Sequence, residues 1–225
     1  MKIGFLHIPK AAGMSFHDAL AANFPQSEIC PLRHDGQYKD ADFSALSSKY
    51  NFFSGHINFD TFQKLEVEKL ISIVRDPIDR IVSVYNYHHN YEPRDGETLM
   101  PNVLSAKNNS FSDWIRTDSK AVMQDLSNGM VRQLSSIYCR NSDLTRSNLD
   151  IALKNIEQID LFGFSSIESG IARIEQSYNL SIKMRVLNTS TYTKRTEDIS
   201  DQDLAYVRSL NELDIELFNS VKSRF

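Results

Sequence analysis

Three short and almost uninterrupted apolar runs constrain the fold of this chain more than any other sequence feature. They lie at residues 3–8, 70–74 and 160–164, and residues 50–54 form a fourth, weaker candidate. Apolar runs without polar alternation are typical of strands buried on both faces, as in a parallel sheet covered by helices. Segments with helical spacing follow at 16–24 and 78–85. This alternation predicts an α/β fold with a central parallel sheet flanked by helices.

The C-terminal third extends the same pattern. Helical spacing predicts helices over 146–157 and 166–178, on either side of the last apolar run. Ser200 is a good N-cap, and acidic residues follow it in the first turn. An apolar stripe from Leu204 to Val221 then predicts one continuous C-terminal helix.

Composition excludes several classes of protein. Among the 225 residues, 25 Lys and Arg stand against 29 Asp and Glu, so broad neutralisation of nucleic-acid phosphates is not expected. No apolar stretch approaches the ~20 residues of a membrane span, and the N-terminal run is too short for a signal peptide. Cys30 and Cys139 lie far apart and form no CxxC pair. We therefore expect a cytoplasmic protein without disulfides, folded as a single domain over residues 1–225.

The connection after the first apolar run has the composition of a phosphate-binding loop. Residues 8–15 read Ile-Pro-Lys-Ala-Ala-Gly-Met-Ser and lead directly into a helical segment. Backbone N–H groups at the start of a helix bind anions, Gly13 allows close approach of the backbone, and Ser15 adds a hydroxyl group. The nucleotide-triphosphatase pattern fails, because Ile8 replaces its first glycine and Met14 its lysine. On these residues alone, a phosphate site and an ordinary strand-to-helix connection remain alternatives.

A second polar cluster follows the apolar run at 70–74. Asp76 is placed to cap a helix whose first residue is Pro77. The helical wheel puts Ser83 on the polar face, and Arg75 lies where a parallel strand ends, the usual ligand edge of such a sheet. An arginine and a hydroxyl group together suit a phosphate dianion. The alternative is an arginine that supports the helix beside a solvated serine.

His56 lies directly after the fourth candidate strand and a glycine. A histidine at the ligand edge of a sheet is well placed to accept a proton, although a single histidine is more often structural. The other N-terminal histidines, His7, His17 and His34, show no metal-ligand spacing, and we expect no metal site.

Three segments together resemble one enzyme family. HIPKAAGMSF, VRDPIDRIVSVY and GHINF are similar to motifs of the sulfotransferases that use 3′-phosphoadenosine 5′-phosphosulfate (PAPS), in particular the group related to heparan sulfate 2-O-sulfotransferase. The resemblance implies a P-loop-type three-layer fold. It also implies that His56 is the catalytic base, that Lys10 is catalytic, and that Arg75 and Ser83 hold the 3′-phosphate. The loop residues that would hold the 5′-phosphosulfate are Lys10, Ala11, Ala12, Gly13, Met14 and Ser15.

Other segments match this family more loosely. Residues 185–196 form a polar, basic segment where the family often has a loop that folds over the nucleotide, so Lys194 and Arg195 are expected nucleotide ligands. Residues 128–134 also resemble a family segment. Two residues before the base, where those relatives can carry another histidine, this chain has Ser54.

The acceptor is less constrained. Residues 90–109 contain prolines, a glycine and several asparagines without a clear period, which predicts a long surface loop, and such loops are often functional. Several side chains near it either shape an acceptor pocket or serve as ordinary core and surface residues. They are Tyr87, His88, His89, Tyr91 and Trp114.

The sequence thus predicts a sulfotransferase that moves a sulfuryl group from PAPS, its cosubstrate, to a hydroxyl group of a small-molecule or carbohydrate acceptor. Adenosine 3′,5′-bisphosphate would leave, and no divalent metal is expected because Lys10 and Arg75 take its place. A P-loop small-molecule kinase is the first alternative, and a noncatalytic nucleotide-binding module is the second.

Overall fold

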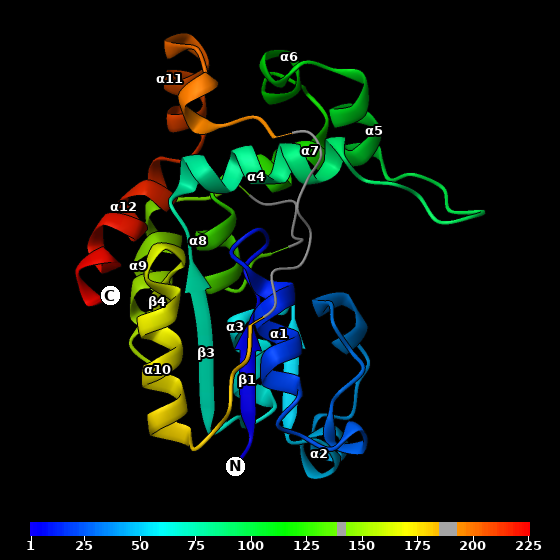
Figure 1. The fold of residues 1–225 in the computed structure, drawn as a ribbon, viewed down its shortest axis with the longest axis vertical. Helices are drawn as coiled ribbons and strands as arrows, with labels where there is room; N and C mark the ends of the chain where they lie inside the picture. The colour runs from blue at the N-terminus through cyan, green and yellow to red at the C-terminus, as the bar shows by residue number, and fades with distance from the viewer. Residues whose placement is uncertain (139–142, 185–192) are drawn as a thin grey trace.

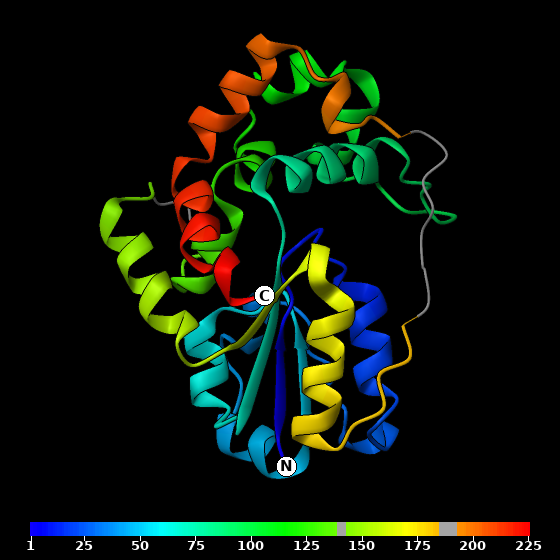
Figure 2. The same cartoon turned by 60° about the vertical axis from the view of Figure 1, so that its left-hand side comes forward.

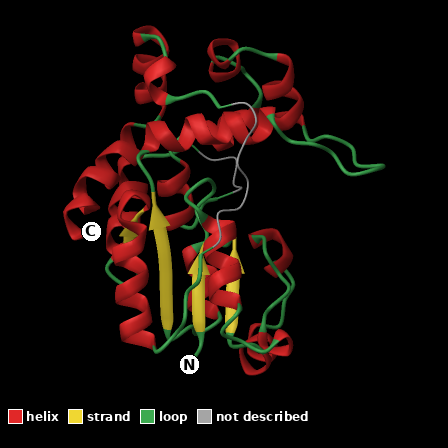
Figure 3. Ribbon diagram, viewed as in Figure 1, coloured by secondary structure: helices red, strands yellow, loops and turns green. Residues whose placement is uncertain are grey.

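Parallel strands form the centre of the molecule, as predicted. The computed structural model describes residues 1–138, 143–184 and 193–225. The strands are β1 Ile3–Leu6, β2 Phe52–Gly55, β3 Lys69–Val74 and β4 Asp160–Gly163. Their spatial order is β2-β1-β3-β4 and every neighbouring pair is parallel, so the strand arrows in Figure 3 point the same way. The carboxyl ends of all these strands therefore lie at one edge of the sheet.

Helices cover both faces of this sheet. The α-helices are α1 Gly13–Ala21, α2 Phe43–Lys49, α3 Phe59–Lys64, α4 Pro77–His89, α5 Pro101–Asn108, α6 Phe111–Ile115, α7 Lys120–Leu126, α8 Gly129–Leu134, α9 Arg146–Ile156, α10 Ile167–Tyr178, α11 Asp201–Leu210 and α12 Glu212–Val221. Short 3-10 turns are η1 Gln26–Glu28, η2 Asp35–Tyr38, η3 Phe164–Ser166, η4 Thr196–Asp198 and η5 Lys222–Arg224. Figures 1 and 2 show α1 and α10 on one face and α3 on the other, which is the three-layer α/β arrangement predicted.

Strand β1 packs against helices on both of its faces. The ring of Phe5 meets Phe16 of α1 edge to face at 5.0 Å, and Phe16 in turn contacts Phe162 of β4 at 5.4 Å. On the opposite face, a Cβ on Gly4 would lie only 2.8 Å from the Phe62 ring of α3. Burial on both faces is the physical reason why this strand has no polar alternation.

A second apolar cluster lies beyond the carboxyl ends of the strands. Helix α4 crosses there, above the end of β3 in Figure 1, and packs with α5, α6, α7 and α11. Trp114 is fully buried in this cluster, with its ring 5.3 Å from that of Tyr85. The Tyr85 hydroxyl donates to the Asn109 carbonyl at 2.9 Å. This cluster holds α4, and the polar side chains that α4 carries, close to the loop after β1.

The prediction of an irregular loop over residues 90–109 was wrong in its second half. Helix α5 occupies Pro101–Asn108, with Pro101 in its first turn and Met100 as N-cap. Only Val103 and Ala106 of this helix are buried. Two buried positions in a short helix make too weak an apolar stripe to stand out in a sequence.

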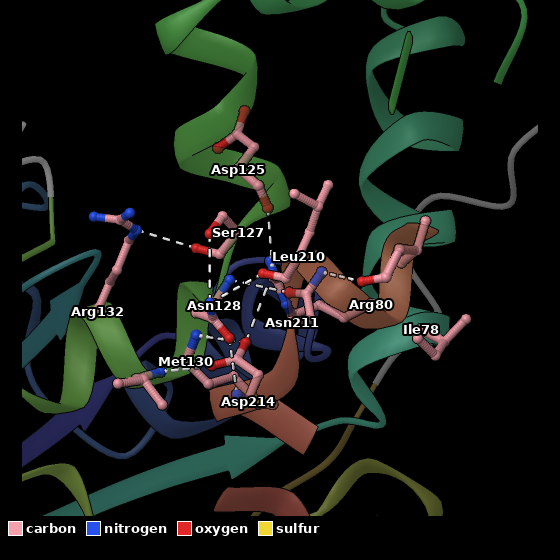
Figure 4. Close-up of polar contacts among 12 residues, drawn as sticks. Ile78, Arg80, Asp125, Ser127, Asn128, Met130, Arg132, Leu210, Asn211 and Asp214 are labelled. Atoms are coloured by element: carbon pink, nitrogen blue, oxygen red, sulfur yellow. Dashed lines mark hydrogen bonds and ion pairs between the residues drawn. The ribbon is translucent and has the colours of Figure 1, made fainter. Parts of the chain in front are cut away.

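The prediction of one continuous C-terminal helix was also wrong. The chain forms α11 and α12 with a break at Asn211, which is fully buried. The Asn211 carboxamide donates to the Val207 carbonyl at 3.0 Å and accepts the Asn128 N–H at 3.0 Å (Figure 4). Because the apolar stripe continues across the break, helical periodicity alone cannot reveal it.

Residues 129–134 form helix α8, with Asn128 as its N-cap, and a buried ion pair holds its first turn. The Asp214 carboxylate of α12 accepts the N–H groups of Met130 at 3.0 Å and Val131 at 2.8 Å (Figure 4). Arg80 of α4 is buried, lies 3.9 Å from Asp214 and donates to the Asp125 carbonyl at 3.1 Å. A Cβ on Gly129 would lie 3.0 Å from the Arg80 guanidinium, so glycine permits this close packing.

Candidate active site

The three segments singled out by the sequence meet at the carboxyl edge of the sheet. His56 follows β2, the loop of residues 7–12 follows β1, and Arg75 follows β3. Since β1 lies between β2 and β3, the loop lies between His56 and Arg75. Parallel α/β sheets bind their ligands at this edge.

The loop after β1 is tightly curved. Lys10 has φ 67° and Ala12 has φ 60°, both left-handed, before α1 begins at Gly13. A Cβ on Gly13 would lie 1.7 Å from the His7 ring, so only glycine allows this approach. Ala11 shapes the loop from inside, because its side chain is buried and its N–H donates to the Ile8 carbonyl at 3.3 Å.

The start of α1 provides donors for an anion. Among the described residues, no side chain caps the first N–H groups of α1, which include those of Met14 and Ser15. Such N–H groups, together with the helix dipole, favour a bound phosphate or sulfate. The Met14 side chain is 55% exposed, so it contributes through its backbone rather than through packing in the core.

Helix α4 carries Ser83 on the face that lines a cavity. The Asp76 carboxylate accepts the N–H groups of Ile78 at 2.9 Å and Asp79 at 3.2 Å, and Pro77 is the first helical residue. This N-cap starts the helix directly after Arg75 and directs Ser83 toward a cavity.

That cavity has a volume of about 370 Å³, within the usual range of ligand pockets. It brings together five of the predicted nucleotide ligands. Its lining residues are Lys10, Arg75, Asp79, Val82, Ser83, Asn86, Tyr87 and Thr193–Thr196, which include Lys194 and Arg195. Residues 185–192 of the basic segment lie outside the described residues.

Arg75 is only partly satisfied in this cavity. One of its terminal nitrogens donates to the Lys10 carbonyl at 3.1 Å, and its guanidinium lies 4.5 Å from the centre of the Phe164 ring. The Arg75 Nε–H is buried and has no hydrogen-bond partner within residues 1–138, 143–184 and 193–225. A buried donor without a partner is costly, and an anion in the cavity would satisfy it.

Lys10 is held over an aromatic ring. Its ammonium lies 4.1 Å from the centre of the Tyr87 ring, a cation–π contact between the loop and α4. Burial and then the neighbouring charge of Arg75 lower the pKa of Lys10 to about 8. The Lys10 amine is therefore still mostly protonated at pH 7 and loses its proton as the pH rises through about 8.

His56 presents one ring nitrogen as a base. Its Nδ1–H donates to the His7 carbonyl at 2.9 Å, so Nε2 is the unprotonated nitrogen of the neutral ring. The His7 ring packs against it at 4.4 Å. Burial lowers the pKa of His56, which keeps the ring neutral at pH 7. His56 does not line the 370 Å³ cavity and belongs to the β2 side of the loop.

Ser54 is turned away from this base. The serine is buried, and its hydroxyl oxygen lies 2.9 Å from Nδ1 of His17 on α1. Burial, followed by the charge of Arg33, lowers the pKa of His17 to about 4. Ser54 therefore belongs to the packing of β2 against α1.

The candidate acceptor residues divide into different environments. Trp114 belongs to the core, and Tyr91 donates to Glu97 at 2.7 Å within the surface loop. Tyr87 faces Lys10 as described. His88 is buried, with Nε2 3.9 Å from the Asp125 carboxylate of α7.

Sequence reasoning missed two polar residues of α4 that line the cavity. Asp79 and Asn86 share a helical face with Ser83, at spacings of four and three residues. This spacing was a usable signal, because a side chain on the same stripe as a proposed ligand must face the same cavity.

Within the described residues, no group of three or more His, Cys, Asp or Glu side chains could hold a metal ion, and no helix is long and apolar enough to cross a membrane. Cys30 is buried and unpaired by a disulfide, and Cys139 lies outside the described residues. A larger hollow of about 550 Å³ lies over α11 and α12, but it contains none of the motif residues.

Comparison with known proteins agrees with this geometry. The sequence pattern of the sulfotransferase family matches residues 1–219. A protein-tyrosine sulfotransferase of Arabidopsis thaliana is 31% identical over 105 residues, which cover 45% of this chain and 20% of that protein. The chain thus spans about a fifth of the length of that relative. Since the family pattern covers nearly the whole chain, including the loop after β1, this protein belongs to the sulfotransferase family.

Proposed function

We propose that this protein transfers the sulfuryl group of PAPS to an acceptor hydroxyl group and releases adenosine 3′,5′-bisphosphate. The observation that carries the proposal is the shared cavity of Lys10, Arg75 and Ser83, built from the ends of β1 and β3 and the face of α4. Family membership supports it. We further propose that residues 1–225 act as one sulfotransferase domain.

The cavity suits a nucleotide with two separate anionic groups. The loop, with Lys10 and the first N–H groups of α1, fits a 5′-phosphosulfate. Arg75, with its unpartnered Nε–H, and Ser83 fit a 3′-phosphate at the other end. Four basic side chains and one carboxylate, that of Asp79, line this cavity, so its lining carries an excess of positive charge that suits an anion.

The chemistry that these residues support is direct transfer. The acceptor oxygen forms a bond to sulfur, and the bond between sulfur and the phosphate oxygen breaks, leaving its electron pair on that oxygen. Nε2 of His56 takes the acceptor's proton, since its other nitrogen is fixed by the His7 carbonyl. Lys10 stabilises the negative charge that develops on the leaving oxygen.

The position of the loop between β2 and β3 supports this division of roles. The donor cavity lies on the β3 side of Lys10, and His56 lies on the β2 side. An acceptor that enters beside His56 would meet the sulfur from the side opposite the leaving nucleotide, as an in-line displacement requires.

The acceptor is proposed to be a carbohydrate hydroxyl group. The GHINF segment, with His56 as base, resembles the group related to heparan sulfate 2-O-sulfotransferase. The matched relative from Arabidopsis thaliana is a protein-tyrosine sulfotransferase, so a phenol is the acceptor to test against it.

Calorimetric titration tests the donor assignment. We expect adenosine 3′,5′-bisphosphate to bind more tightly than AMP or ATP, because only this nucleotide places a phosphate at Arg75 and Ser83. Tighter binding of ATP, together with phosphate transfer, would instead favour the kinase alternative. Labelled PAPS offered with sugars and with tyrosyl peptides then identifies the acceptor class. Binding of the bisphosphate without transfer to any acceptor would leave a noncatalytic module as the better description.

A further inference from the structure

The segment Lys194–Thr196 is fastened along the polar face of α4. The Asn86 carboxamide donates to the Lys194 carbonyl at 2.9 Å and accepts the Lys194 N–H at 3.0 Å. About two turns closer to the start of α4, the Asp79 carboxylate accepts a hydrogen bond from the Thr196 hydroxyl. Ser83 lies between these two anchors on the same face of the helix.

The surroundings of Asn86 favour this contact. The residue is only 8% exposed, and its carboxamide bonds both backbone groups of Lys194, which lies 108 positions later in the chain. Two hydrogen bonds from one planar group fix both the position and the orientation of the segment that they hold. The segment therefore cannot shift along α4 without losing both bonds.

The two basic side chains of the segment differ in what holds them. The Lys194 ammonium donates to the Asp198 carbonyl at 3.2 Å and lies 5.5 Å from the centre of the Phe111 ring. It is therefore already held by contacts other than those to Arg75 and Ser83. Arg195 pairs with Glu197 at 3.4 Å, and both side chains are about 70% exposed. An exposed pair of this kind is weak, so the Arg195 guanidinium is easily turned toward a ligand.

We propose that Asn86 is a positioning residue of the nucleotide pocket, which holds the segment so that Arg195 reaches the bound nucleotide opposite Arg75 and Ser83. This inference rests on the proposed function, because the ligand is the phosphate-bearing donor. Asn86 touches the backbone of the segment and acts through Arg195. Arg195 is the cation that the segment supplies, whereas Lys194 anchors the turn that follows.

The chain offers a matched control. Asn23, just after α1, makes the same pair of bonds: its carboxamide donates to the Ser181 carbonyl at 2.9 Å and accepts the Ser181 N–H at 2.8 Å. Its carboxamide also donates to the last carbonyls of α1, those of Ala19 at 3.0 Å and Leu20 at 3.2 Å. Neither Asn23 nor Ser181 lines the cavity. N23A therefore removes the same type of backbone clamp from elsewhere in the fold, together with the two bonds to α1.

The experiment measures the affinity for adenosine 3′,5′-bisphosphate and the melting temperature of wild type, N86A, N23A, R195A and the double variant N86A/R195A. We expect N86A to weaken the bisphosphate about 5- to 30-fold, less than the full loss of a charge-assisted bond because Arg195 itself remains, and N23A to leave it unchanged. The double variant should bind no more than about twofold worse than R195A, because Asn86 acts through Arg195. Both N86A and N23A should lower the melting temperature, so a loss of affinity in N86A alone is not a general effect of lower stability. T196V, which removes the bond to Asp79 at the other anchor, repeats the test if N86A does not fold.

Two results would overturn the inference while leaving the proposed function intact. One is wild-type affinity in N86A, and the other is a full additive loss in the double variant, which would mean that Asn86 does not act through Arg195. A wild-type protein that does not bind the bisphosphate would overturn the inference and the proposed function together.

Discussion

Replacing Arg75 by alanine tests the reading of the 3′-phosphate. In the proposed complex the guanidinium supplies at least one charge-assisted hydrogen bond, through the Nε–H that lacks a partner within the described residues. Such a bond contributes about 1.5–3 kcal/mol, so R75A should weaken adenosine 3′,5′-bisphosphate by roughly 10- to 150-fold. AMP has no 3′-phosphate, and its affinity should stay nearly unchanged.

The same substitution has a modest cost in stability. It removes the bond from Arg75 to the Lys10 carbonyl, worth about 1 kcal/mol, and the contact with the Phe164 ring, worth about 0.5–1 kcal/mol. At about 2–4 °C for each kcal/mol in a chain of this size, the melting temperature should fall by roughly 3–8 °C. The variant therefore remains folded at 25 °C, where binding is measured.

Calorimetric titration of both nucleotides into wild type and R75A provides the comparison. R116A is the control, because Arg116 also lies over an aromatic ring, 5.0 Å from the centre of Tyr206, but outside the cavity. S83A should show the selectivity of R75A with a smaller loss, as expected for one neutral donor. Equal losses of affinity for the bisphosphate and for AMP in R75A would refute the reasoning, since Arg75 would then support the loop rather than read the phosphate.

Further predictions concern the base, the loop lysine and the buried ion pair. H56A should lower kcat by roughly 10²- to 10⁴-fold with little change in bisphosphate affinity, and near-normal turnover would assign the base elsewhere. Because burial lowers the pKa of His56, the acid limb of kcat/KM should lie below the usual histidine value of 6.5. Since Lys10 loses its proton as the pH rises through about 8, kcat/KM for the donor should decline above that pH. K10R, whose guanidinium stays charged, should abolish this decline, and an unchanged decline would point to another group. D214A should destabilise the fold by about 3–5 kcal/mol in urea unfolding, because it leaves Arg80 buried without its partner. A loss under about 1 kcal/mol would show that the pair is dispensable.

Local chemistry made much of the fold and of the site predictable. Strands buried on both faces read as continuous apolar runs, and the cap formed by Asp76 and Pro77 marked the start of α4 two residues after Arg75. The loop around Gly13 was recognisable because its conformation depends on neighbours in sequence. These features depend mainly on residues close together in the sequence, so they can be predicted without the tertiary structure.

Contacts between distant segments decided the rest. Asn86 contacts Lys194 only because the segment 108 residues later lies against α4. No local sequence pattern near either residue predicts this contact. Asn211 breaks the last helix because its buried carboxamide bonds Asn128. In the same way, Arg80 can be buried because Asp214 and the Asp125 carbonyl lie opposite. The sequence by itself therefore determined the strands, their capped helices and the loop that faces the ligand edge. Which polar side chains stay in water and which become buried anchors was decided by the tertiary structure, because a buried polar group is stable only when folding supplies its partner.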